Sequence, residues 1–388
     1  MPRGKLRKVC PQCGGTRTKR HSILVLKKVT LEGVEPRGVQ RWYCNDCKKA
    51  FTPAHADSGT SKYALEVRER AVMLYFDQGA SYRAVARELG RLGIRVDGKR
   101  CWRMVQQMSA NCKAPWEASV ELKPPQWSGW IAVDGDSLPI GRIRESVLLG
   151  VDLRVLDIPH AILAEGEDVE NGLHYFLVLK QIGYPFRGVV SDGDPGIEAA
   201  VKLVCPGIPH QLCVKHFADG IHRYLRYEFD YRFGNQKEIE RFEEPVKKCL
   251  YAKDIALAQT HLKRIRADLV YHRLGFSGVI GMLEQQWNRL TAHFHYPGLM
   301  RTSHTAEVII RKLDRRINAM DGFASHDTAW NPLKMLVMHT RFRVLTDCRG
   351  PRRLLNGLSP LQLAGIDAQN MNWIRFSQKS QQSSERNS

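Results

Sequence analysis

Between residues 130 and 214, strand-like and helical segments follow one another in an order that leaves few folds open. Three strand-like segments come first: WIAVDGDSL, SVLLGVDL and HAILAEGE. A helix (DVENGLHYFLVLKQIG), a strand (RGVVSDG), a second helix (DPGIEAAVKLV) and a last strand (IPHQLCV) follow. Three consecutive strands and then alternating helices and strands predict a mixed sheet with helices on its faces. We therefore expect an α/β core whose first and fourth strands lie side by side.

Two aspartates occupy special positions in this pattern. Asp134 lies in the middle of the first strand between apolar residues, and Asp192 directly follows the fourth strand. Asp194 is predicted to be the N-cap of the next helix, so Asp192 lies at the strand edge where open α/β sheets bind ligands. Two carboxylates at neighbouring strands repel unless a cation lies between them, and oxygen ligands suit Mg²⁺ or Mn²⁺. Asp136, on the same strand face as Asp134, is a possible further ligand.

The cysteines indicate a second metal site near the N-terminus. Four of the ten form two Cys-x-x-Cys pairs, Cys10/Cys13 and Cys44/Cys47, each followed by Gly or Lys and joined by a β-rich stretch. Two such knuckles predict a zinc ribbon over residues 1–53 with one structural Zn²⁺ held by four thiolates. A redox role needs only one pair and a βαβ context, which is missing here. A domain this small would depend on its metal for stability.

Residues 53–62 resemble a linker, and residues 63–112 then supply three short helices. The second helix is predicted to begin after Ser81 and the third near Asp97. This pattern fits a helix-turn-helix DNA-binding domain, although any small helical bundle shares the same periodicity. Its candidate DNA-binding side chains are Arg83, Arg87, Lys99, Arg100 and Arg103.

The charge balance favours a polyanionic partner. Lys and Arg number 59 against 40 Asp and Glu, a formal net charge of +19, and phosphate contacts are made mainly by these basic residues. A basic but unspecialised protein is the alternative. No apolar run reaches the length of a membrane span, and the N-terminus lacks the apolar stretch of a signal peptide. We therefore expect a cytoplasmic protein that binds nucleic acid and no membrane.

Four short motifs in order resemble a known family, the DDE transposases of the Mutator-like group and related bacterial insertion sequences. VDG at 133–135 and SDG at 191–193 resemble the segments of the family's two aspartates. A Cys-x-x-His, here Cys213 to His216, and a stretch with the family's glutamate, here Glu307 in TSHTAEVIIRKLDRR, follow. His304 stands where the family more often has Asn.

The resemblance implies an RNase H-like catalytic core over 128–216 and 300–345, a helical insertion domain over 217–299, and a zinc ribbon and helix-turn-helix as companions. We expect the tail, 376–388, to be disordered. Asp134, Asp192 and Glu307 would be the catalytic residues and would hold two Mg²⁺ (or Mn²⁺) ions. Their implied reaction is Mg²⁺-dependent cleavage and strand transfer at the ends of a mobile element. A basic stretch after Glu307 would hold the DNA backbone: Arg311, Lys312, Arg315 and Arg316.

The implied partners are double-stranded DNA, both the terminal repeats of the element and the target, and further copies of the chain in a dimer or larger homo-oligomer. The expected location is the nucleoid of a prokaryotic cell. Two alternatives remain open: an inactive transposase-derived DNA-binding regulator, and an RNase H-like nuclease that cuts without joining.

Cys213 and His216 look at first like half of a second zinc site. Zinc needs three or four protein ligands, and the nearest further candidate is His210, because Cys205 precedes a Pro-Gly turn. We therefore expect the pair to support the active site instead. On this hypothesis a neutral His216 imidazole orients a carboxylate ligand or a water molecule.

Overall fold

The structure is a computed structural model that describes residues 8–52, 62–122, 124–166, 168–230, 236–320 and 322–379. The chain divides into two compact units: Met1–Cys112 with Asn372–Ser388, and Lys113–Met371. The predicted linker lies outside the described residues except for Lys62.

The first unit contains a three-stranded antiparallel sheet in the order β1-β2-β3. A small core lies at one end of this sheet, where Trp42 and Phe51 pack beside the buried Cys10 and Cys44. The strands are β1 (Thr18–Val29), β2 (Val34–Cys44) and β3 (Ala50–Phe51).

Three helices follow in the first unit: α1 (Leu65–Phe76), α2 (Tyr82–Arg91) and α3 (Gly98–Ala110). The predicted helix starts are confirmed, because the side chains of Ser81 and Asp97 accept hydrogen bonds from the backbone N–H groups of α2 and α3. The C-terminal segment returns to this unit as α17 (Trp373–Ser377), whose Arg375 donates to Glu69 at 2.8 Å.

The start of the predicted disordered tail needs correction. Residues 376 and 377 end α17, and Gln378 forms a β-bridge with Cys112. The Lys379 N–H donates to the Asn111 carbonyl at 2.9 Å. Sequence polarity alone did not reveal these backbone pairings. Residues 380–388 of the predicted tail lie outside the described residues.

The second unit is built around a mixed five-stranded sheet in the order β6-β5-β4-β7-β8. Strands β4, β5 and β6 form an antiparallel meander, and β7 and β8 run parallel to β4, so the first and fourth strands are neighbours as expected. The strands and the two helices between them are β4 (Trp130–Ile140), β5 (Ile143–Asp152), β6 (Ala161–Ala164), α5 (Val169–Gln181), β7 (Gly188–Ser191), α6 (Pro195–Val204) and β8 (His210–Leu212).

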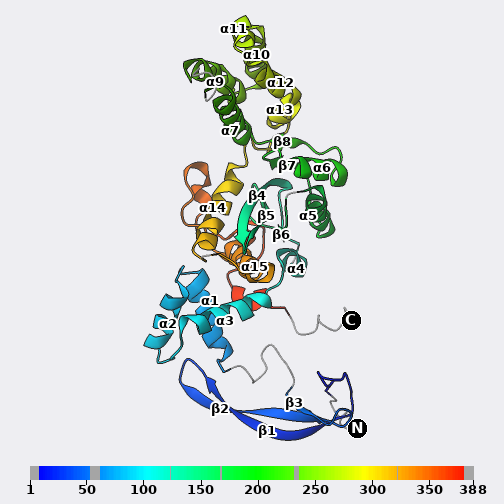
Figure 1. The fold of residues 1–388 in the computed structure, drawn as a ribbon, viewed down its shortest axis with the longest axis vertical. Coiled ribbons are helices and arrows are strands. Elements are labelled where there is room, and N and C mark those ends of the chain that lie inside the picture. The colour runs from blue at the N-terminus through cyan, green and yellow to red at the C-terminus, as the bar shows by residue number, and fades with distance from the viewer. Residues whose placement is uncertain are drawn as a thin grey trace. The chain divides into compact units, whose positions relative to one another are not determined.

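Helices cover both faces of this sheet (Figure 1). The main core lies between the sheet and helices α5 and α6, where Ile131, Tyr175 and Phe176 are fully buried. On the other face, Ile310 and Leu313 of α14 (His304–Asn318) and apolar residues of α15 (His326–Phe342) pack against β4, β5 and β6. The predicted helix beginning near Ser303 is therefore confirmed, and it packs on the strand that carries Asp134.

Between β8 and α14 the chain forms a helical subdomain with its own hydrophobic core, in which Phe242 and Phe276 stack. No helix among the described residues has the length and apolarity to span a membrane. The helices of this subdomain are α7 (Val214–Leu225), a π-helix (Arg226–Asp230), α9 (Gln236–Leu250), α10 (Ile255–Ala267), α11 (Leu269–Arg273), α12 (Ser277–Gln285) and α13 (Trp287–His295). The rest of the unit adds α4 (Pro115–Glu121), a 3-10 helix (Gly350–Leu355) and α16 (Pro360–Leu363).

Candidate active site

The register of two parallel strands brings Asp134 and Asp192 to the same place. Ala132 of β4 pairs with Val190 of β7, and each aspartate lies two residues further along its own strand direction. The Asp194 N–H donates to Asp192 at 3.1 Å, and Asp194 in turn caps α6 as predicted. Asp192 therefore lies at the carboxyl end of β7, the edge where α/β sheets bind ligands, beside Asp134 in the middle of β4.

Glu307 reaches this edge from the first turn of α14. Its side chain is only 10% exposed, and its Oε2 accepts a hydrogen bond from the Lys215 ammonium at 2.8 Å. Its Oε1 accepts from the Ser303 hydroxyl at 3.4 Å and lies 3.8 Å from Nε2 of His216. Although burial alone would raise it, these neighbours hold the pKa of Glu307 below its usual value.

The pKa of Asp134 reflects both its burial and the charges of the other two predicted carboxylates. Burial raises the pKa of Asp134, the charge of His216 opposes this rise, and the negative charges of Asp192 and Glu307 add to it, so that the pKa is about 7. A carboxyl group that is buried and faced by two others ionises with difficulty unless a cation joins it. Both other predicted residues are thus close enough to Asp134 to act on its pKa, and the ligand atoms that lie within 4.8 Å of those of Glu307 belong to Cys213 and His216.

Cys213 and His216 lie against Glu307. Suitable ligand atoms of these three residues lie within 4.8 Å of one another, and the Cys213 thiol accepts hydrogen bonds from the N–H and hydroxyl of Ser303 at 3.4 and 3.3 Å. A hydrogen bond with Cys213 raises the pKa of His216 to about 9, which favours the protonated ring over the neutral imidazole expected from the sequence. His210, considered above as a zinc ligand, instead contacts the Ser191 hydroxyl at 2.8 Å.

Asp136 lies beside Asp314 of α14, a residue that the sequence analysis missed. Burial raises the pKa of Asp314 on α14 to about 7, and a hydrogen bond with Asp136 and the charges of Asp136 and Asp134 add to the rise. Asp314 follows Glu307 by seven residues, two helical turns, and therefore lies on the same helix face. The seven-residue spacing from Glu307 is the sequence signal that could have identified Asp314. Lys215, beside the Cys-x-x-His motif, was also missed.

In the first unit, the four predicted zinc ligands form one cluster. Two sulfur pairs, Cys10–Cys47 and Cys13–Cys44, lie 3.6 and 3.7 Å apart. Each knuckle turns through a left-handed residue four positions after its first cysteine, Gly14 at φ 70° and Lys48 at φ 56°. Burial raises the pKa of Cys10, but backbone N–H groups outweigh this and lower it to about 7, which favours a thiolate. The cluster is compatible with a zinc ribbon.

The predicted DNA-binding side chains differ in their exposure. On α14, Arg311 and Arg315 are exposed, Arg316 is half-buried, and Lys312 is paired with Asp347 at 2.9 Å. The five candidates on α2 and α3 are all exposed: Arg83, Arg87, Lys99, Arg100 and Arg103.

The fold and the candidate site together are a mixed α/β sheet with acidic residues on two neighbouring strands and on an adjoining helix. The sequence model described as "Transposase, Mutator family" matches residues 155–340. The match covers just under half of the chain and supports the Mutator-like transposase that the motifs predicted. The match includes Asp192, Cys213, His216 and Glu307; Asp134 lies before it, as do the cysteine cluster and helices α1 to α3.

Comparison with solved structures gives distant similarities. The Drosophila P element transposase strand transfer complex has 9% identity and a TM-score of 0.32, covering 85% of this chain and 95% of that one. The simian T-cell lymphotropic virus intasome in complex with PP2A regulatory subunit B56 gamma has 11% identity and a TM-score of 0.20, covering 48% and 70%. With TM-scores this low, neither similarity bears on the fold. No curated protein matches the sequence.

Proposed function

We propose that this transposase is a DDE enzyme that cleaves DNA at the ends of a mobile element and joins those ends to target DNA. The observation that carries the proposal is the pairing of β4 with β7, which sets Asp134 beside Asp192, together with the effect of Glu307 on the pKa of Asp134. The meander followed by α/β units, with its first and fourth strands adjacent, supports an RNase H-like core over 128–216 and 300–345.

The donor set fits Mg²⁺ or Mn²⁺. All three groups offer carboxylate oxygens, the ligands these ions prefer, and the raised pKa of Asp134 reflects negative charge that a divalent cation would neutralise. When bound, two such ions would supply Lewis-acid activation of the attacking oxygen and charge stabilisation of the leaving oxygen.

The chain's own residues prepare this site. Lys215 and Ser303 both donate hydrogen bonds to Glu307, which fixes the carboxylate and keeps it ionised. The buried Cys213 accepts two hydrogen bonds from Ser303 and lies beside His216, so the start of α7 is anchored to the start of α14. Cys213 and His216 would thus position Glu307 without touching the DNA.

DNA binding is the proposed role of the exposed cations. We assign end recognition to a helix-turn-helix formed by α1, α2 and α3, and backbone contacts to Arg311 and Arg315 on α14. The four-cysteine cluster would hold one structural Zn²⁺. Joining two element ends calls for two active sites, so the working form would be a dimer or larger assembly on DNA, at the nucleoid of a prokaryotic cell.

The test uses the full chain and labelled duplexes taken from the DNA that flanks its gene. Asp134→Asn, Asp192→Asn and Glu307→Gln should each abolish Mg²⁺-dependent cleavage and joining while leaving duplex binding within about twofold. Glu165→Gln, an exposed carboxylate in the same unit, is the matched control and should keep full activity. Near-normal activity in any of the three variants would remove that residue from the site.

Two other outcomes would favour the alternatives. Binding without any cleavage by the unaltered protein would indicate a DNA-binding regulator. Cleavage without joining would indicate a nuclease.

A further inference from the structure

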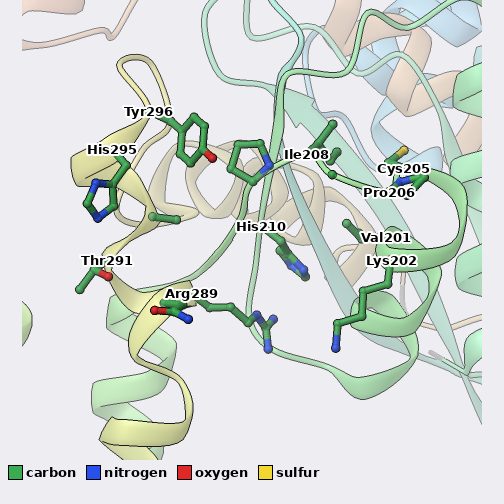
Figure 2. Close-up of a pocket in the computed structure, with 14 residues that line it drawn as sticks. Val201, Lys202, Cys205, Pro206, Ile208, His210, Arg289, Thr291, His295 and Tyr296 are labelled. Carbon is green, nitrogen blue, oxygen red and sulfur yellow. The ribbon is translucent and has the colours of Figure 1, made fainter.

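A pocket of about 620 Å³ lies between the end of α6, the loop that leads into β8, and helix α13. Its volume falls in the range of about 300–1,000 Å³ that is typical of small-molecule sites. In Figure 2, Arg289 and Lys202 extend toward the same end of the pocket, with the ring of His210 between them, and Tyr296 lines the opposite end. None of these residues was singled out as a DNA contact from the sequence.

The frame of the pocket is well fixed. Gln211 of β8 is fully buried, and its side chain donates to the Leu290 carbonyl at 3.1 Å and accepts from the His293 N–H at 2.8 Å. These two hydrogen bonds join helix α13 to the edge of the sheet. The position of Arg289 relative to β7 and β8 is therefore set by the fold.

The guanidinium of Arg289 is the feature that points to a ligand. Its Nη1 donates to Glu198 at 2.5 Å and to Gln286 at 3.2 Å, but its Nε and Nη2 are buried and have no hydrogen-bond partner among the described residues. Its side chain is 17% exposed. Buried donors are nearly always paired, so a small shift of this side chain toward an acceptor in the pocket would be favourable.

The charge at this end of the pocket remains positive. Lys202 and Arg289 share the single carboxylate of Glu198, at 2.8 and 2.5 Å. Burial lowers the pKa of His210 to about 3, so this ring is neutral and adds no charge. The two cations outnumber the one carboxylate that they contact, Asp192 acts on Arg289 only through its charge, and a phosphate offers the several acceptors that the unpaired N–H groups of Arg289 need.

The opposite end suits a flat, uncharged group. Tyr296 offers an aromatic ring there, with Ile208 and Pro206 in the same part of Figure 2, and His295 and Pro209 also line the pocket. Nucleobases stack on such surfaces regardless of sequence. A pocket with a phosphate-binding end and a stacking end is matched to one nucleotide.

The pocket also lies next to the candidate active site. Asp192 contributes to the electrostatic environment of Arg289, and the Ser191 hydroxyl, one residue before Asp192, contacts His210. We propose that this pocket holds one unpaired nucleotide of the DNA strand next to the phosphodiester that is cut, with its phosphate on Arg289 and Lys202 and its base against Tyr296. The inference rests on the proposed DNA-cleaving function. It identifies where the DNA strand contacts the protein beside the active site.

The experiment measures binding and cross-linking without added Mg²⁺, so it does not depend on cleavage. A short single-stranded oligonucleotide with 5-iododeoxyuridine is mixed with the full, zinc-loaded chain in buffer without added Mg²⁺, its affinity is measured by fluorescence anisotropy, and photo-cross-links are mapped by mass spectrometry. We expect cross-links on the peptide that contains His295 and Tyr296. Arg289→Gln should weaken binding by about tenfold, since a charge-assisted phosphate contact is of that order.

Arg264→Gln, which removes an exposed arginine from α10 in the same subdomain, is the matched control and should change affinity by less than about twofold. Tyr296 is 44% exposed, so the Tyr296→Leu variant should fold normally and lose the cross-link. Equal affinities of the Arg289→Gln and Arg264→Gln variants, or cross-links that map only outside the pocket, would overturn the proposal. If the pocket binds as expected but the chain cleaves no DNA, the proposed function fails and the nucleotide site stands.

Discussion

The crowding of carboxylates predicts that Asp134 destabilises the Mg²⁺-free protein at neutral and higher pH. Its pKa rises from an ordinary value of 3.8 to about 7 in the folded state, mainly because the group is buried and secondly because Asp192 and Glu307 face it. A raised folded-state pKa of an acid means that the folded state holds the proton more tightly than the unfolded state. The destabilisation therefore begins above pH 4, grows as the pH rises, and is complete above pH 7.

The magnitude follows from the two pKa values. Their difference corresponds to about 4 kcal/mol of lost stability above pH 7 and to about 1 kcal/mol at pH 4.5. Asn keeps a polar group in the same buried place, so Asp134→Asn should recover part of this, about 2–3 kcal/mol at pH 8. For a unit of this size the gain corresponds to a rise in melting temperature of about 4–12 °C.

Differential scanning calorimetry at pH 4.5 and pH 8, in buffer without added Mg²⁺ and without a chelator that would remove the structural zinc, measures the effect on the full chain. Saturating Mg²⁺ should stabilise the unaltered protein and narrow its difference from Asp134→Asn, because the ion binds the folded state. Glu165→Gln is the control and should stay within about 0.5 kcal/mol. An Asp134→Asn advantage that is absent at pH 8, or equal at both pH values, would refute the argument that burial and the neighbouring carboxylates raise the pKa of Asp134.

Two further predictions concern the other clusters. Cys44→Ser should reduce bound zinc, measured by atomic emission, from about one ion per chain to below half an ion. Chelation should unfold the β1–β2 sheet of the unaltered protein, which circular dichroism would detect. A sheet that stays folded without metal would contradict the zinc ribbon. His216→Ala should lower the cleavage rate by about 10- to 100-fold with unchanged zinc content, because the residue lies beside Glu307 and acts by positioning it. Two zinc ions per chain, falling to one in Cys213→Ser, would instead show that this pair binds zinc.

The sequence predicted the parts of the site that depend on chain order and strand pairing. Asp134 and Asp192 could be placed together because the winding rules make the first and fourth strands neighbours. Glu307 lies more than a hundred residues after Asp192, and no pattern of periodicity links them. Its assignment depended on the resemblance to a family.

The remaining contacts depend on how helices rotate and dock, which periodicity does not determine. Asp314 meets Asp136 only because α14 packs on β4 with this face toward the strand. Arg289 reaches the sheet edge because Gln211 fixes α13 against β8, a contact between residues about eighty positions apart. Local signals, such as the helix caps at Ser81 and Asp194, were predicted well because capping involves only neighbouring residues.

The charge balance of the site has a consequence for metal binding. Glu307 is already ionised, because the Lys215 ammonium pairs with it, whereas Asp134 holds its proton up to about pH 7. A divalent cation binds the carboxylate form, so its entry must release the Asp134 proton. We expect Mg²⁺ affinity to rise with pH through about 7 and then level off.

Isothermal titration calorimetry at pH 6.5 in two buffers of different ionisation enthalpy should detect release of close to one proton per site, and release should be absent in Asp134→Asn. Equal heats in both buffers for the unaltered protein would show that Asp134 is already ionised, and that the three carboxylates do not crowd one another as the structure places them.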